Sequence, residues 1–293
     1  MTQPATIDAL GQQFWLLAIA LLAFGLVVGS FLNVVIYRLP LMLEARWRRD
    51  CCELLELPAE KQERPLSLVT PNSHCPHCLA PVKPWQNVPV ISYLFLRGRC
   101  ANCGVAISPR YPLVELATGL LTLALAWQFD VDLALLGAML LTWALVTLSM
   151  IDFDTQLLPD DITLPLVWLG LAFNLNGTFV SLHDAVIGAM AGYLLLWSVF
   201  WAFKILTGKE GMGYGDFKLL AALGAWLGWQ SLPLIILLSS LVGAAVGVVL
   251  ILLRRRGKDV PIPFGPYLAA AGWIALLWGE EIIHAYLRSS GLA

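Results

Sequence analysis

Charged side chains are scarce in this chain of 293 residues: Asp, Glu, Lys and Arg together make up 13% of it, and hydrophobic residues make up 59%. Soluble domains carry about a quarter charged residues. This scarcity, together with a mean hydropathy of +0.76, excludes an ordinary soluble protein and indicates an integral membrane protein. We therefore expect the lipid bilayer as a partner and no nucleic acid.

Positive charge is absent from the first twelve residues, which contain no Lys or Arg. A secretory signal peptide begins with a positively charged segment and has a short apolar region. The apolar stretch at 14–37 is too long for such a region, so it predicts a first transmembrane helix that is kept.

Seven further apolar stretches approach the roughly 20 residues that cross a bilayer as a helix. They span 112–129, 133–151, 162–176, 185–206, 217–230, 231–253 and 264–283. The sequence thus predicts an all-α polytopic membrane protein with about eight transmembrane helices. The stretches at 162–176 and 217–230 are short, so we expect each to be tilted, partly re-entrant or shielded by its neighbours.

The cations are distributed unevenly between the two sides of such a protein. If the eight helices alternate in direction, seventeen of the eighteen Lys and Arg residues fall on one side. The positive-inside rule makes that side cytoplasmic and both termini periplasmic. We expect three parts: residues 1–37 with the first helix, a cytoplasmic loop at 38–111, and a seven-helix membrane domain at 112–293.

Four of the six cysteines form two C-x2-C pairs, Cys75 with Cys78 and Cys100 with Cys103, separated by 21 residues. Two such pairs supply the four thiolates of a tetrahedral zinc site. Disulfides are disfavoured because the loop is expected in the reducing cytoplasm. A four-cysteine site has no open position, so we expect a structural zinc ion that folds the loop. His74 and His77 are either competing ligands or surface residues.

Acidic residues at the ends of membrane helices are costly and invite a functional interpretation. On the expected cytoplasmic side they are Glu115, Asp152, Asp154, Asp160, Asp161 and Asp216. Asp154, Asp160 and Asp161 also fit interfacial positions, and Asp160 or Asp161 fits a helix N-cap before the stretch at 162–176.

Asp152 ends the third predicted span and Asp216 begins the sixth, so we expect both at the same depth. Two carboxylates in one low-dielectric site tend to share a proton, which suits one to accept a proton from water and the other to polarise a carbonyl. Helix polarity favours Asp216 as the anion and Asp152 as the proton carrier. From spacing alone, an ion or proton pathway explains the pair equally well.

Several motifs carry a resemblance to a known family. The segment at 211–220, GMGYGDFKLL, resembles the GxGD signature of intramembrane aspartyl proteases. Together with the cysteine pairs, other segments resemble type IV prepilin peptidases along essentially the whole chain. They are GSFLNVVIYRLP (29–40), RYPLVEL (110–116), IDFDTQLLPD (151–160) and PIPFGPYLAAAG (261–272).

This resemblance implies Asp152 and Asp216 as the protease dyad. It implies prepilins and pseudopilins of type IV pili and type II secretion as substrates, cut at the cytoplasmic membrane face before their hydrophobic stretch. Family members with the cysteine loop resemble bifunctional enzymes that also methylate the new N-terminal amine with S-adenosylmethionine. The sequence lacks a glycine-rich nucleotide fingerprint after a strand, so this second activity rests on resemblance, and its ligand residues stay unassigned.

Two other classes of protein compete with this interpretation. An ion- or proton-coupled transporter would use the same aspartates, but no inverted repeat is visible. A zinc-loop scaffold for a secretion machine explains the cysteines and leaves the glycine-flanked aspartate unexplained.

Overall fold

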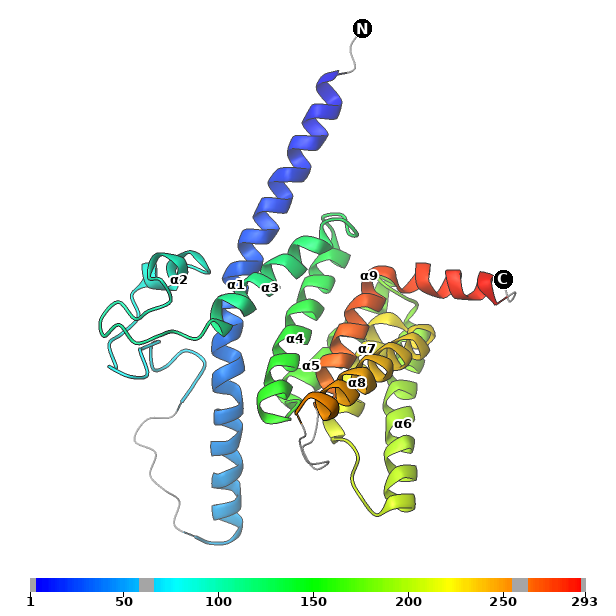
Figure 1. Ribbon diagram of the computed structural model, residues 1–293. Coiled ribbons are helices and arrows are strands. Elements are labelled where there is room, and N and C mark those ends of the chain that lie inside the picture. The colour runs from blue at the N-terminus through cyan, green and yellow to red at the C-terminus, as the bar shows by residue number, and fades with distance from the viewer. Residues whose placement is uncertain (1–3, 58–65, 255–262, 291–293) are drawn as a thin grey trace. The chain divides into compact units, whose positions relative to one another are not determined.

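The computed structural model describes residues 4–57, 66–254 and 263–290 (Figure 1). In the segment at 261–272 that carries part of the resemblance, Pro261 and Ile262 fall outside the described residues. The described chain is helical and contains no strand, only two isolated β-bridges. The predicted all-α class is confirmed for this part of the chain.

Helices lie at all eight predicted positions. Their bounds are α1 Pro4–Leu54, α3 Arg110–Leu125, α4 Leu133–Thr155, α5 Asp160–Phe173, α6 Leu182–Thr207, α7 Tyr214–Leu227, α8 Leu232–Arg254 and α9 Gly265–Ser289, with a short α2 at Ile91–Phe95. Among the described residues, four segments are long and apolar enough to cross a membrane, in α1, α4 and α6 and at Trp229–Val249. The helices α5 and α7, at the two short predicted spans, have only 14 residues each.

The chain divides into two compact units, Met1–Trp127 and Gln128–Ala293. In the first unit, α1 and α3 pack closely because small residues let the backbones approach. A Cβ added to Gly29 would lie 2.8 Å from Glu115 Cα, and one added to Gly25 would lie 2.8 Å from Thr122 Cβ. Asn33 on α1 donates a 3.1 Å hydrogen bond to the carbonyl of Tyr111 on α3. This bond joins the two helices.

In the second unit, α7 is the central helix. It packs against α5, α6 and α9, and every residue from Leu219 to Leu227 is buried. Neighbouring helices therefore enclose α7, which agrees with the expectation that this short stretch is shielded by its neighbours.

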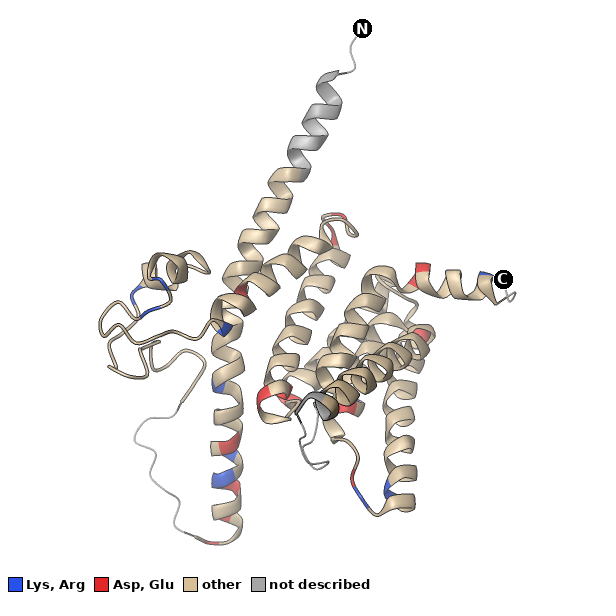
Figure 2. Cartoon of the chain, in the orientation of Figure 1, with Lys and Arg blue, Asp and Glu red and all other residues tan. Residues whose placement is uncertain are grey.

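Local signals set the ends of the helices in this unit. The Asp132 carboxylate accepts hydrogen bonds from Ala134 N and Leu135 N and caps α4. Gly208, at φ 70°, ends α6 in the left-handed conformation that glycine adopts without strain. Figure 2 shows that most acidic residues of the second unit lie near helix ends, whereas Glu280 and Glu281 lie within α9.

Candidate functional site

Asp152 and Asp216 come from two different helices of the second unit. Asp152 lies in the last turn of α4 and is 5% exposed, whereas Asp216 lies in the first turn of α7 and is 6% exposed. Leu158 lies against Gly215, the residue before Asp216, and against Gly265, where an added Cβ would lie 2.7 Å from Asp152 Oδ2. The structure therefore brings together the two aspartates that their positions in the sequence singled out.

A third segment completes the arrangement. The backbone N–H of Gly265, the first residue of α9, donates a 2.9 Å hydrogen bond to Oδ2 of Asp152. Asp216 itself lies in the first turn of α7. Each carboxylate thus lies at the N-terminus of a helix, a position that favours negative charge.

Buried Leu158 lies between the starting residues of α7 and α9. A Cβ on Gly215 would lie 2.6 Å from Leu158 Cβ, and a Cβ on Gly265 would lie 3.1 Å from Leu158 Cδ2. Gly215 therefore permits close backbone approach. Gly211, Gly213 and Gly215 all lie outside the left-handed region, and Gly213, with φ −83°, leads directly into the regular helix α7.

The other acids near this end take different roles. Asp160 was a candidate N-cap, but the cap position falls on Pro159. Asp160 instead accepts two hydrogen bonds, of 2.6 and 2.7 Å, from Lys218 Nζ on α7. Asp154 and Asp161 are exposed. None of these three shares the burial of the aspartate pair.

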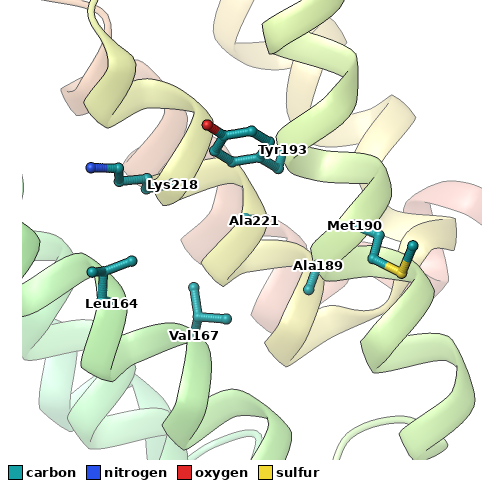
Figure 3. A pocket seen from close by; sticks show the side chains of 7 residues that line it. All are labelled: Leu164, Val167, Ala189, Met190, Tyr193, Lys218 and Ala221. Atoms are coloured by element: carbon teal, nitrogen blue, oxygen red, sulfur yellow. The ribbon is translucent and has the colours of Figure 1, made fainter.

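An apolar pocket of about 300 Å³ lies on another face of α7, between α5 and α6. Figure 3 shows Leu164 and Val167 on one side of it, Ala189 and Met190 on the other, and the Lys218 ammonium group at its end. Lys218 follows Asp216 by two residues, so the two side chains leave the helix on nearly opposite faces. The pocket is therefore separate from the aspartate pair.

The four cysteines meet in the first unit. Their Sγ atoms all lie within 4.8 Å of one another, with Cys75 and Cys103 at 3.9 Å and Cys78 and Cys100 at 4.0 Å. A tetrahedral zinc ion with bonds of about 2.3 Å requires sulfur atoms about 3.8 Å apart. The geometry of the four thiols thus fits such an ion.

Two hydrogen bonds prepare one of these thiols for metal binding. The Asn102 side chain, whose Nδ2 lies 3.5 Å from Cys78 Sγ, and the Ala80 backbone lower the pKa of Cys78 to about 6. The lower pKa favours the thiolate, which is the form that binds metals. His74 and His77 are exposed and lie outside the cluster. The structure therefore favours a role as surface residues over a role as competing metal ligands.

Glu115 belongs to the first unit and is 9% exposed. Its Oε2 accepts a 2.8 Å hydrogen bond from Val90 N, and Ser30 on α1 contacts the same carboxyl group. Val90 has the unusual backbone angles φ 60° and ψ −49°. Glu115 therefore ties the cysteine-containing segment to the α1–α3 pair.

Comparison with known proteins places this geometry in a family. Residues 23–129 match the model of the bacterial peptidase A24 N-terminal domain, and residues 139–248 match that of the type IV leader peptidase family. A prepilin leader peptidase/N-methyltransferase of Aeromonas hydrophila is 60% identical over 94% of this chain and 95% of its own length. The chain belongs to the prepilin leader peptidase/N-methyltransferase family.

Other relatives with the same printed name support this membership. The Pseudomonas aeruginosa protein is 58% identical over 91% of this chain and 92% of its own length. The Legionella pneumophila protein is 47% identical over 93% of this chain and 95% of its own length. No solved structure matches the chain. The family resemblance that the motifs indicate is confirmed.

The two family models divide the candidate residues between them. The N-terminal model contains the four cysteines and Glu115, and the peptidase model contains Asp152 and Asp216. Gly265 lies beyond the residues matched by either model. Sequence reasoning did not assign Gly265 a role, and its place in the resembling segment at 261–272 was the only signal for it.

Proposed function

We propose that this protein is a bacterial inner-membrane enzyme that cleaves the leader from prepilins and pseudopilins through Asp152 and Asp216 and then methylates the new N-terminus. The peptidase part rests on one observation: two buried aspartates from α4 and α7 lie around the same residue, Leu158, which packs against Gly215 next to Asp216 and against Gly265 next to the Asp152 carboxylate. The names of the relatives support prepilins as substrates.

Such a pair carries out peptide hydrolysis with one proton shared between the two carboxyl groups. The ionised carboxylate takes a proton from water, the water oxygen bonds to the carbonyl carbon, and the protonated carboxyl gives its proton to the carbonyl oxygen. When the carbon–nitrogen bond breaks, the amine takes the first proton and the second returns to its original carboxyl. The pair ends in its starting state, with one water molecule consumed.

Burial supports this chemistry in two ways. Both carboxyl groups are nearly inaccessible, and electrostatic interactions are stronger in such an environment than in water. Like charges in close proximity also disfavour double ionisation, so the pair keeps its shared proton. A transporter that uses the same aspartates finds no support among the relatives, all of which carry peptidase names.

The membrane placement of this site follows from the cation distribution. We infer eight transmembrane helices, periplasmic termini and a peptidase site at the cytoplasmic face. The short helix α7 counts among the eight because neighbouring helices cover it, and α5 counts because its sequence is apolar. The prepilin would present its apolar segment from the bilayer and its leader from the cytoplasm.

The first unit is assigned a zinc ion and the methyl-transfer activity. Cys75, Cys78, Cys100 and Cys103 would hold the zinc and fix the fold of the segment around them. S-adenosylmethionine would supply the methyl group for the amine released by cleavage. The domain divisions at 37 and 111 are kept as part of this proposal.

Incubation of the purified, detergent-solubilised protein with a prepilin tests the proposal directly. We expect a mobility shift on a gel as the leader is removed, and transfer of label when S-adenosylmethionine labelled in its methyl group is added. Asp152→Asn and Asp216→Asn should each lower the rate of cleavage by about a hundredfold or more, because acid–base catalysis usually contributes a factor of this size to the rate.

The matched control is Asp154→Asn, which makes the same chemical change at an exposed position in the same turn of α4. It should cleave at the wild-type rate. Wild-type cleavage by either of the other two variants would refute the aspartate pair, and absence of cleavage by the unmodified protein would refute the peptidase assignment.

A further inference from the structure

The N-terminus of α9 lies directly beside the carboxylate of Asp152. Gly265 is the first residue of this helix, so its N–H has no acceptor within α9. It donates to Asp152 Oδ2 at 2.9 Å, across 113 residues of sequence, and the bond is buried. A carboxylate in this position receives both a hydrogen bond and the positive end of the helix dipole.

Only glycine permits this contact. A Cβ at position 265 would lie 2.7 Å from Asp152 Oδ2 and 3.2 Å from its Cγ, with Leu158 Cδ2 at 3.1 Å on another side. A side chain of any kind would therefore displace either the carboxylate or the start of α9. The residue acts through its backbone and through the space that it leaves.

The contact changes which aspartate is expected to carry the charge. Asp152 lies at the C-terminal end of α4, which disfavours an anion, whereas Asp216 lies in the first turn of α7, which favours one. Judged by their own helices alone, Asp216 would be ionised. The N-terminus of α9, a third helix, supplies Asp152 with a hydrogen-bond donor. This donor offsets the unfavourable effect of the α4 C-terminus on a negative charge at Asp152.

We propose that Gly265 is a positioning residue that orients Asp152 and favours its charged form. Asp152 is then the carboxylate that takes the proton from water, and Asp216 holds the shared proton and gives it to the carbonyl oxygen. This assignment rests on the proposed peptidase function of the pair.

Other titratable groups lie on the elements that pack against α4, which are α5 and α9. On α5, Asp160 is bound by Lys218, and Asp161 is exposed. On α9, Tyr267 lies two residues after Gly265. The next titratable residue on this helix, Glu280, lies about 22 Å from Gly265 along the helix axis. On α4 itself, Asp154 is exposed. Asp216 remains the other buried acid at this end of the helices.

The dependence of prepilin cleavage on pH tests the proposal in the full-length, detergent-solubilised protein. The rate should rise with pH as the pair loses its first proton and fall as it loses the second. In Gly265→Ala the added Cβ moves the Asp152 carboxylate away from the N–H of residue 265, so the charged form loses this hydrogen bond and the acidic limb should move to higher pH by about one unit. The basic limb, which reports the proton on Asp216, should stay in place.

Gly279→Ala is the matched control, because it makes the same change in the same helix where the nearest atom is 3.7 Å away. It should leave both limbs unchanged. An added Cβ could also prevent folding, so a second variant keeps glycine's lack of a side chain. In this variant an ester oxygen replaces the backbone N–H of residue 265, which removes the hydrogen-bond donor and adds no Cβ. It should show the same shift of the acidic limb.

The possible outcomes separate this inference from the function on which it rests. Unchanged limbs in both Gly265 variants would overturn the positioning role, and a shift of the basic limb alone would overturn the assignment of the base to Asp152. Cleavage by Asp152→Asn at the wild-type rate would instead refute the aspartate pair itself.

Discussion

Gly188 on α6 and Gly224 on α7 face each other backbone to backbone in the second unit. A Cβ added to either glycine would overlap the carbonyl oxygen of the other. One turn further along α6, Gly192 lies against the carbonyl of Leu220 in the same way. Small residues spaced like this let two membrane helices approach closely, which supplies packing energy where the bilayer offers no hydrophobic driving force.

Gly224→Ala should therefore destabilise the protein. The obstructing atoms are backbone and cannot rotate away, so α6 and α7 must separate, at a cost of about 1–3 kcal/mol. Thermal unfolding in detergent, followed by circular dichroism, measures the loss. Gly279→Ala, whose added methyl group would meet its nearest atom at an ordinary contact distance of 3.7 Å, is the control and should unfold at the wild-type temperature; equal stability of the two variants would contradict this account.

A second packing contact holds α7 against α5. The indole Nε1 of Trp226 donates a 2.8 Å hydrogen bond to the carbonyl of Leu166, and the ring covers Gly170, where a Cβ would lie 2.5 Å from the indole. The indole is completely buried, so its N–H depends on this acceptor.

Trp226→Phe should cost about 1–2 kcal/mol, since it deletes a buried hydrogen bond and part of the ring volume. Trp229→Phe makes the same change at a tryptophan that is 46% exposed and should cost less. The two variants are compared by unfolding in detergent, and a larger loss for Trp229→Phe would show that burial does not set the cost.

The sequence predicts most of this architecture because each of its signals is local. Apolar stretches locate the eight long helices, and the pairs at Cys75–Cys78 and Cys100–Cys103 locate a cluster that the structure confirms. Asp152 and Asp216 were found because an acid at the end of an apolar helix is conspicuous. In each case the information lies within a few residues of the feature that it predicts.

The details that the sequence does not predict are contacts between distant segments. The bond between Gly265 and Asp152 spans 113 residues, and no local pattern in the chain indicates it. The pairing of Lys218 with Asp160 likewise replaced an expected helix cap, because α7 brings a cation to the start of α5. Such contacts follow from packing, which a single sequence does not specify residue by residue.

Glu115 should be required to hold the cysteine-containing segment in place. Glu115→Ala leaves the N–H of Val90 without its acceptor, and an unsatisfied buried donor costs about 1–3 kcal/mol. Hydrogen exchange of the amides at 66–109 should accelerate about tenfold, because a loss of 1.4 kcal/mol changes a local opening equilibrium by that factor.

The companion variant Glu115→Gln keeps an acceptor oxygen at nearly the same place. It should retain most of the protection of these amides, which would show that the hydrogen bond matters more than the charge. Equal acceleration in both variants would show instead that the negative charge of Glu115 is what holds the segment.

The four-cysteine cluster should contain about one zinc ion per chain, as its geometry fits a closed tetrahedral site. Cys75→Ser should lose most of this metal, because the remaining three thiolates no longer close the site. Metal analysis of the purified protein by mass spectrometry gives the stoichiometry. Limited proteolysis should show faster cleavage within 66–109, since zinc binding and folding of such a segment are coupled.

Cys51→Ser provides the matched control for zinc, because this cysteine is exposed at the end of α1 and lies outside the cluster. It should keep its zinc and its resistance to proteolysis. A chelator that removes the metal from the unmodified protein should reproduce the proteolysis pattern of Cys75→Ser. If the metal-free protein stayed resistant, hydrogen bonds such as that from Val90 to Glu115 would be sufficient to hold the segment, and the zinc would not be needed for its fold.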